Sequence, residues 1–502
     1  MPTFAPSQLA AWTGGRWTRS PGGALTGFTQ DTRALGPGQV FVALRTDRRD
    51  GHDFLRDAQA RGAAAALVAR EIGDCALPQL VVGDSLASFQ TVAREHRRQF
   101  PGPVVGVTGS AGKTSTKDLM ALLLGGAPDG LASGSTGARA GDAAPGDFAP
   151  VLKTEGNLNN RAHGDDAAPG DFAPVLKTEG NLNNHIGVPL TLTRLDPAVH
   201  HSAVVEAGIN MPGEMAGLAD MIQPDHAIVT LVGPAHLERL GTIEGVAAEK
   251  ARLLAAVRPG GRQVFPVSCW PFAAFRGLAD PLVLVPANEG MVRVDARTVS
   301  FTVLHRPDRT EVTLAGRRPF LLRRVSGGMA QNAALALALA GELGVADATL
   351  QKRIEAWAPA KWRGELQRVG QADIYCDFYN ANPASMQDAI AAFAGLVPAE
   401  RPRLYVLGGM EELGAAAADF HRQLGRGILL RPGDHLFAIG VHAEALREGL
   451  LENGNDPAQV EVVGALEPVR ARLAGFRGAV FLKGSRRHQL ERLLGAEAAP
   501  AH

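Results

Sequence analysis

The sequence predicts an α/β protein built from largely parallel sheets with helices packed on them, and three observations support this. Short apolar runs typical of strands alternate with helical stretches along most of the 502 residues. A glycine-rich turn with a lysine and two hydroxyls stands between a strand and a helix, at 106–116. At roughly 100–200 residues per domain, this length also predicts about three domains.

The composition is typical of a soluble globular protein. Hydrophobic residues make up 45%, charged residues 20%, and 51 basic residues balance 51 acidic ones, so no nucleic-acid partner is expected. No apolar run reaches membrane-spanning length, and the N-terminus lacks the pattern of a leader. The 3 cysteines lie far apart without metal-ligand spacing, which fits a reducing compartment. We therefore expect a cytoplasmic enzyme without membrane insertion.

The predicted elements divide into three α/β units. Residues 1–100 contain predicted strands at 39–44 and 80–82 and a helix at 54–61. Residues 101–358 repeat strand, turn and helix, with strands at 103–105, 203–205, 227–231 and 263–265 and helices at 117–124, 243–257 and 331–343. Residues 359–502 form a Rossmann-like unit, with strands at 403–407, 435–439 and 479–482.

The glycine-rich turn has the features of a nucleotide phosphate site. It reads TGSAGKTST at 108–116, a TGxxGKT form with a shorter loop than GxxxxGK[ST]. Backbone N–H groups at the start of the next helix would face phosphate oxygens, Lys113 would neutralise them, and Thr114 would hold Mg²⁺. A turn with a merely solvated lysine is the alternative. The expected nucleotide-binding residues of this turn are Gly109, Ser110, Ala111, Gly112, Lys113, Thr114 and Ser115.

A tandem duplication follows the phosphate turn. The 19 residues 142–160, DAAPGDFAPVLKTEGNLNN, recur at 166–184, and a glycine-, alanine- and serine-rich stretch precedes them. One pair of copies cannot build a stacked repeat core. We interpret about 126–165 as an insertion, because only the second copy continues into HIGVP at 185–189. Deleting 142–165 should accordingly leave the function intact.

Two motifs in order, TGSAGKTST and TEGNLNNHIGVP at 178–189, resemble the ATP-dependent Mur ligases of peptidoglycan precursor synthesis. The resemblance implies a three-domain architecture with a central P-loop ATPase domain and a C-terminal Rossmann-like domain. Three stretches resemble the domain that holds the uridine-diphosphate end of the substrate: FTQDTR at 28–33, PGQVFVAL at 37–44 and DGHDF at 50–54. Asp31, Thr32 and Arg33 are therefore expected to bind substrate.

Within this family, three motifs resemble the branch that joins D-alanyl-D-alanine to UDP-N-acetylmuramoyl-tripeptide: YNANPASM at 379–386, VLGGMEELG at 406–414 and LKGSR at 482–486. The resemblance implies that ATP converts the tripeptide carboxylate into an acyl phosphate, which the amine of D-alanyl-D-alanine attacks. It also implies two Mg²⁺ ions and a monomer. A Mur-type ligase that adds a single amino acid, a folylpolyglutamate-type ligase and a non-ligating P-loop ATPase remain alternatives.

Three further residues are expected near the phosphates and Mg²⁺. Glu206 ends the strand in VVEAGIN, where its carboxylate suits Mg²⁺, although a solvated strand-end glutamate is the alternative. His236 follows the next strand and matches the family histidine near the second Mg²⁺, although a structural histidine is the alternative. Lys250 matches a family lysine that reacts with carbon dioxide to give a carbamate, a metal ligand, although a surface helix lysine is the alternative.

Several amides are expected around the same site. Asn181, Asn183 and Asn184 would lie near the phosphates and the substrate, or else cap turns. Asn332 matches the family residue that contacts adenine. The chain departs from the family just before it, because Gly328-Met329 replaces a His-Asn pair, which puts adenine contacts from that segment in doubt.

The third unit should contribute the remaining groups. Arg363 would reach the phosphates from the connector. Asp377 resembles the family carboxylate that binds ribose, which implies that Tyr379 and Asn380 flank the base. A second departure from the family is Gly409, where Asp is common. Substrate or acyl-phosphate contacts are expected from a basic loop, unless it is only solvated: Lys483, Ser485 and Arg486.

Overall fold

The computed structural model describes residues 1–127, 174–289 and 293–495. Three sheets follow one another along this chain, so the predicted α/β class and three-domain architecture are confirmed. The predicted boundaries after residues 100 and 358 stay predictions. The interpretation of the insertion and the duplication falls on 128–173, outside the described residues.

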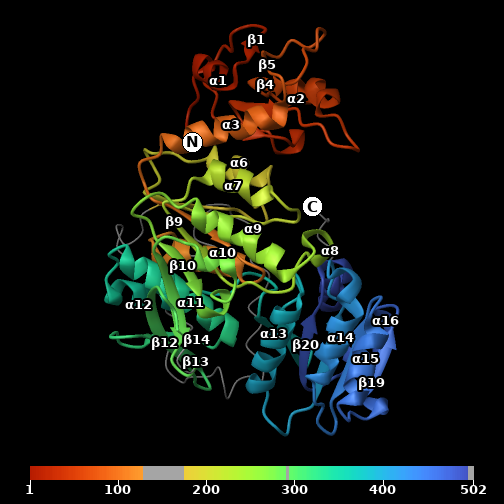
Figure 1. Ribbon diagram of the computed structural model, residues 1–502. Coiled ribbons are helices and arrows are strands. Elements are labelled where there is room, and N and C mark those ends of the chain that lie inside the picture. The colour runs from red at the N-terminus through yellow and green to blue at the C-terminus, as the bar shows by residue number, and fades with distance from the viewer. Residues whose placement is uncertain (128–173, 290–292, 496–502) are drawn as a thin grey trace.

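The first sheet has the order β1-β5-β4-β3-β2, parallel except for β1. Its strands are β1 Arg16–Trp17, β2 Gly27–Thr29, β3 Gln39–Val42, β4 Ala65–Val68 and β5 Gln79–Val81. The helices are α1 Pro6–Thr13, α2 Leu55–Ala60 and α3 Ser85–Arg98, with short 3₁₀ turns at Thr32–Ala34 and Gly51–Phe54. This part stands apart at the top of Figure 1, in red and orange.

The second sheet carries the predicted phosphate turn and has the order β14-β13-β12-β11-β10-β9-β6-β8-β7. Its strands are β6 Val104–Thr108, β7 Val175–Lys177, β8 Ser202–Glu206, β9 His226–Val229, β10 Gln263–Pro266, β11 Pro281–Pro286, β12 Arg297–His305, β13 Arg309–Leu314 and β14 Phe320–Arg323. The strands from β7 to β12 are parallel, and β13 and β14 extend the sheet antiparallel.

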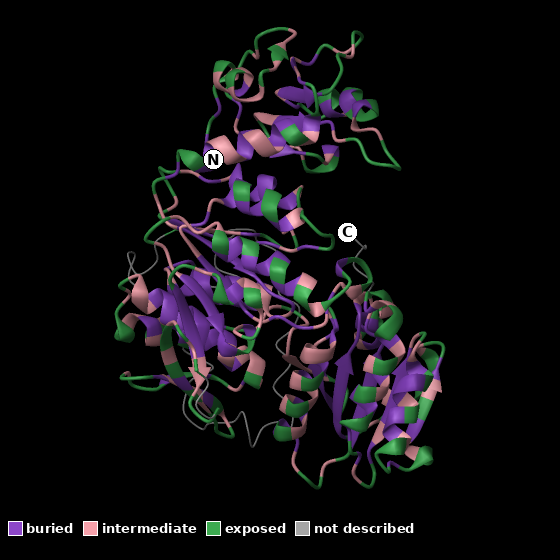
Figure 2. Cartoon of the chain, viewed as in Figure 1, coloured by how far each residue is buried: buried purple, intermediate pink, exposed green. Residues whose placement is uncertain are grey.

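Helices cover both faces of this second sheet. One core packs the sheet against α4 Lys113–Leu123, α11 Gly327–Glu342 and α12 Asp347–Glu355. The other packs it against α6 Gly187–Leu192, α7 Glu214–Ile222, α9 Ile243–Ala255 and α10 Ala273–Arg276. Two short pieces complete this part, α8 Leu237–Leu240 and the 3₁₀ turn Val267–Cys269. Its strands are largely buried in Figure 2, as expected for a parallel sheet with two covered faces.

The third sheet has the order β15-β16-β20-β17-β18-β19, parallel except for the edge strand β15. Its strands are β15 Glu365–Val369, β16 Ala372–Cys376, β17 Arg403–Gly408, β18 His435–Ile439, β19 Val460–Val463 and β20 Ala479–Lys483. The helices are α13 Pro383–Leu396, α14 Ala417–Arg426, α15 Ala443–Glu452 and α16 Glu467–Leu473. Short 3₁₀ turns lie at Gly414–Ala416, Pro457–Gln459, Arg486–His488 and Leu490–Leu494.

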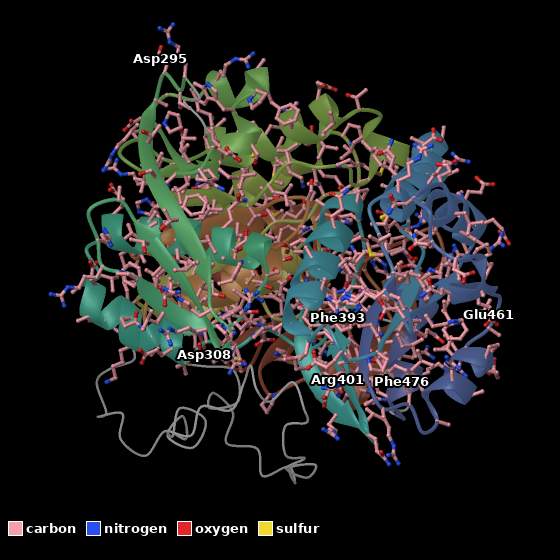
Figure 3. All side chains as sticks on the ribbon, turned by 90° about the horizontal axis from the view of Figure 1, so that it is seen from below. Asp295, Asp308, Phe393, Arg401, Glu461 and Phe476 are labelled. Carbon is pink, nitrogen blue, oxygen red and sulfur yellow. The ribbon has the colours of Figure 1, made fainter. Side chains whose placement is uncertain are left out.

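Helix α13 lies beside the second domain and supports the functional site. It begins with a capping box, in which the Asn382 side chain accepts the Ser385 N–H, and with Pro383 at its first position. Phe393, labelled on this helix in Figure 3, is fully buried against Tyr405 and Phe481 of the sheet. The cap therefore fixes the start of α13, and Phe393 anchors its C-terminal half to the sheet.

Two helices begin earlier than the sequence predicts. Helix α4 begins at Lys113 rather than 117, directly after Gly112, whose left-handed φ of +77° turns the chain into the helix. Helix α11 begins at Gly327 rather than 331, because the Ser326 side chain accepts the Met329 N–H and caps it. Both helices therefore start closer to the candidate site than the sequence predicts. Among the described residues, no helix is long and apolar enough to cross a membrane.

Candidate active site

The phosphate turn is held in a defined shape by its neighbours. The Ser110 hydroxyl donates to the Gly233 carbonyl at 2.9 Å, and the Thr230 hydroxyl donates to the Ala111 carbonyl at 2.5 Å. The Lys113 ammonium donates to the Gly109 carbonyl at 3.0 Å. These contacts leave a short loop at the N-terminus of α4, which is a suitable place for phosphate groups.

A pocket of about 430 Å³ opens at this loop between the second and third domains. Most of the sequence-predicted site residues line it together. They are Ser110, Ala111, Gly112, Lys113, Thr114, Ser115, Asn181, Asn183, Asn184, Glu206, His236, Asn332, Arg363, Asp377, Tyr379, Asn380 and Lys483. The third domain thus faces the phosphate turn across one cavity of nucleotide size.

Glu206 brings a buried carboxylate to the pocket from the end of β8. One of its oxygens accepts a hydrogen bond from the Asn183 side chain at 2.8 Å. The other oxygen, Oε2, is buried without a hydrogen-bond partner. Such an orphaned carboxylate oxygen, in the pocket that Thr114 also lines, fits a bound cation. Among the described residues, no group of three or more His, Cys, Asp and Glu side chains is arranged to hold a metal.

Two lysines differ in their relation to the pocket. Desolvation lowers the pKa of Lys113, while the charge of Glu206 opposes this effect. Lys250 lies on α9, is 1% exposed, and is not among the pocket-lining residues. Desolvation, and then the charge of Lys113, lower the pKa of Lys250 well below its ordinary value. The neutral amine of Lys250 is therefore favoured.

His236 is held by a residue of the third domain. Its Nδ1 contacts the carboxylate of Glu412, and the Glu238 N–H donates to the Glu412 carbonyl at 3.2 Å. His236 and Glu412 both have left-handed backbones, with φ of 55° and 63°. Two strained residues in mutual contact often mark a functional position.

The third domain contributes charged and aromatic groups to the opposite wall. The Lys483 ammonium forms a 2.7 Å ion pair with Asp377, at the carboxyl end of β20. The Arg363 guanidinium lies 4.0 Å from the centre of the Tyr379 ring. The two walls are also joined directly, because the Asn382 side chain donates to the Ser110 carbonyl at 2.9 Å.

The roles of all the predicted site residues stay predictions, and some of these residues lie outside the pocket lining. Gly109, at the start of the loop, is not among the lining residues, and its carbonyl accepts the hydrogen bond from Lys113. Asp31, Thr32 and Arg33 belong to the first domain, where the Arg33 guanidinium pairs with Asp31 at 2.7 Å and holds the pKa of that carboxyl at about 2.

Two residues of the basic loop also lie outside the lining. Ser485 caps the turn Arg486–His488. Arg486 pairs with Glu491 and lies 4.7 Å from the centre of the Trp362 ring.

Four pocket or contact residues were not assigned from the sequence: Asn382, Glu412, Arg324 and Asp388. The Asn-Pro pair at 382–383 is a helix-start signal, so capping by Asn382 was open to prediction. Its reach to Ser110 depends on how two domains pack, which local sequence does not encode. The same holds for Glu412, Arg324 and Asp388.

The fold and pocket define a nucleotide-dependent enzyme whose P-loop domain faces a Rossmann-like domain. Residues 107–275 match the Mur ligase middle domain, and residues 362–486 match the Mur ligase, glutamate ligase domain. The UDP-N-acetylmuramoyl-tripeptide--D-alanyl-D-alanine ligase of Escherichia coli (strain K12) is 32% identical, over 84% of this chain and 83% of that protein. The chain belongs to the Mur ligase family, whose members are ATP-dependent amide ligases.

Solved structures of Mur ligases have the same fold as this chain. The crystal structure of MurF from Acinetobacter baumannii is 26% identical and superposes with a TM-score of 0.79, covering 99% of this chain and 98% of that one. MurF from Thermotoga maritima, solved in complex with ADP, is 24% identical with a TM-score of 0.71, covering 94% and 96%, and shares the fold.

Proposed function

We propose that this protein joins D-alanyl-D-alanine to UDP-N-acetylmuramoyl-tripeptide at the expense of ATP, giving the pentapeptide precursor of peptidoglycan. The observation that carries the proposal is the single pocket in which the phosphate turn and the charged groups of the third domain face one another. The name of the Escherichia coli relative, similar over most of both chains, supports the choice of substrates.

The reaction needs an activated carboxylate. A tripeptide carboxylate oxygen attacks the γ-phosphorus of ATP, the bond to the β-phosphate oxygen breaks, and ADP leaves. The amine of D-alanyl-D-alanine then attacks the acyl carbon, inorganic phosphate leaves, and the nitrogen loses a proton. Since phosphoryl transfer asks for little covalent chemistry from the protein, positioning and charge neutralisation carry the catalysis.

The residues take the following parts in this proposal. Lys113 and the N–H groups of the loop bind the phosphates, and Arg363 offsets charge from the other wall. Asn183 orients Glu206 through its 2.8 Å hydrogen bond. Bound Mg²⁺ would stabilise negative charge on the phosphate oxygens, and the residues to hold two such ions are Thr114, Glu206 and His236, with Lys250 if carbamylated.

Carbamylation of Lys250 is part of the same proposal. Only a neutral amine adds to carbon dioxide, and the lowered pKa of the buried Lys250 supports that form. We further propose a monomeric, cytoplasmic enzyme. The roles of Asp31, Thr32 and Arg33 in holding the uridine diphosphate, and of Ser485 and Arg486 near the acyl phosphate, remain proposals as well.

Product analysis tests the function. Purified protein, ATP, Mg²⁺, UDP-N-acetylmuramoyl-tripeptide and D-alanyl-D-alanine should give one UDP-pentapeptide per ADP, measured by mass spectrometry. Lys113→Ala should reduce the rate about 100-fold or more, because it removes a phosphate ligand. Product with a single amino acid in place of D-alanyl-D-alanine would favour another ligase of the family. ATP turnover that ignores both peptide substrates would contradict ligation altogether.

A further inference from the structure

A carboxylate of the third domain meets the first turn of α11 inside the pocket. Asp388 lies on α13 and lines the cavity. Its Oδ1 accepts the backbone N–H of Gly328 at 2.8 Å, and the Ser326 side chain also hydrogen-bonds this carboxylate. Asp388 has no ion-pair partner among the described residues. An ionised carboxylate has about four lone-pair sites, so these two hydrogen bonds leave it the capacity to accept another from a ligand.

Gly328 and Asp388 are sterically matched. A Cβ built on Gly328 would lie 2.7 Å from Asp388 Oδ2 and 3.0 Å from its Cγ. Any side chain at position 328 would therefore displace the carboxylate. The replacement of the family's histidine by Gly328 thus goes together with a carboxylate that fills the vacated space from the other domain.

The position of this carboxylate along the pocket indicates what it meets. Asn332, one turn further along α11, is close enough to the phosphate loop that a Cβ on Gly112 would lie 2.2 Å from its Nδ2. Asp388 accepts the N–H of Gly328, which lies four residues, or roughly 6 Å, from Asn332 along α11. The pocket lining includes apolar side chains on α13 and at the start of α11, Val325, Met329, Ala392 and Leu396, together with the polar side chains of Arg324, Ser326 and Tyr375. Apolar surface with a few polar groups, among them a carboxylate that would repel a phosphate, suits a planar base better than a phosphate.

We propose that Asp388 is the base-selecting residue of the nucleotide site, a role that rests on the proposed use of ATP. Its carboxylate accepts a hydrogen bond from the exocyclic amine of adenine. Guanine presents a carbonyl oxygen at the corresponding ring position, so two acceptors would face each other and binding would weaken. Asp388 thereby supplies the polar contact with the base that Gly328-Met329 cannot make through side chains.

Nucleotide binding to the full-length protein tests this without the peptide substrates, so the result does not depend on ligation. Calorimetric titration with ADP and with GDP should show a preference for ADP in the wild type. Asp388→Asn and Asp388→Ala should lower ADP affinity about tenfold, as expected for a lost hydrogen bond to a charged group, and leave GDP affinity equal or higher. Gln387→Ala, at the exposed neighbouring position on α13, should preserve the preference.

A second arm separates base selection from mere contact between domains. Gly328→Ala should also weaken ADP binding by displacing the carboxylate, but should add nothing in the Asp388→Ala background. If the Asp388 variants weaken ADP and GDP equally, the residue only joins the domains and base selection is wrong. Unchanged ADP affinity in both variants, with thermal unfolding at the wild-type temperature, would equally overturn it.

Discussion

At the scale of single residues, the phosphate loop depends on a glycine with two constraints. Gly112 has a left-handed φ of +77°, and its α-carbon lies against the Asn332 side chain. The first constraint favours glycine on backbone grounds. The second links the loop to α11, which lines the same pocket.

Gly112→Ala should therefore weaken ADP binding and lower the free energy of unfolding by about 1–2 kcal/mol, the cost of a left-handed alanine. Calorimetry and urea denaturation measure the two effects. Gly316→Ala is the matched control, because Gly316 has φ of +75° but no atom within 4 Å of its added Cβ. It should lose similar stability and keep full ADP affinity. Equal loss of affinity in both variants would rule out the Asn332 contact as the cause.

The residue scale also shows what a sequence can reveal about the site. Lys113 and Glu206 were predictable because each stands at a strand or helix end with a side-chain type suited to phosphate or a cation, and Asp377 because it matches a family carboxylate. Glu412 and Asp388 were not, since nothing near them in the sequence marks their contacts with His236 and Gly328. Such contacts exist only once two domains have packed.

At the scale of elements, the third sheet is held at its N-terminal edge by a buried ion pair. Arg403 begins β17, Asp434 precedes β18, and their side chains are 3% and 1% exposed. Asp434 also accepts the backbone N–H groups of Arg403 and Arg431. Removing one partner would leave a buried, uncompensated charge.

Asp434→Ala should lower the free energy of unfolding by about 3–5 kcal/mol in urea denaturation. Glu448→Ala, which breaks the exposed ion pair with Arg422 between α14 and α15, should cost less than about 1 kcal/mol. A cost for Asp434→Ala as small as that of the control would show that the pair does not hold the sheet edge.

Most elements were predictable from apolar periodicity, while their ends were less so. The strands β17, β18 and β20 were placed within one residue, because short apolar runs between polar turns define them. The starts of α4 and α11 were missed by four residues each, since Gly112 and Ser326 fix them through backbone conformation and capping. The antiparallel extension β13–β14 also went unpredicted, because its alternating polar residues resemble a surface loop.

At the scale of the whole molecule, buried histidines should make stability depend on pH. Burial lowers the pKa of His421, whose Nε2 accepts the Met410 N–H at 2.9 Å and whose Nδ1 lies 2.6 Å from the Ala417 carbonyl. Burial also lowers the pKa of His96. In the unfolded chain these imidazoles take up protons at a higher pH than in the folded protein. Between the folded and unfolded pKa values, the unfolded state therefore binds more protons.

The free energy of unfolding should therefore fall as pH drops from about 7.5 to 5.5, through and below the unfolded histidine value of roughly 6.5. Urea denaturation at the two pH values measures the difference. It should be smaller in His421→Asn and unchanged in a control, His201→Asn, at an exposed position. Stability that rises towards pH 5.5 would contradict the assignment of neutral buried imidazoles.

The second and third domains face one another across one pocket, and the central claim is that ATP activates the tripeptide carboxylate there before D-alanyl-D-alanine attacks. Oxygen transfer tests this most directly. UDP-N-acetylmuramoyl-tripeptide with an ¹⁸O-labelled terminal carboxylate, incubated with ATP and D-alanyl-D-alanine, should release inorganic phosphate that carries one ¹⁸O atom per peptide bond formed. Phosphate without ¹⁸O, at a normal yield of the pentapeptide, would contradict an acyl phosphate.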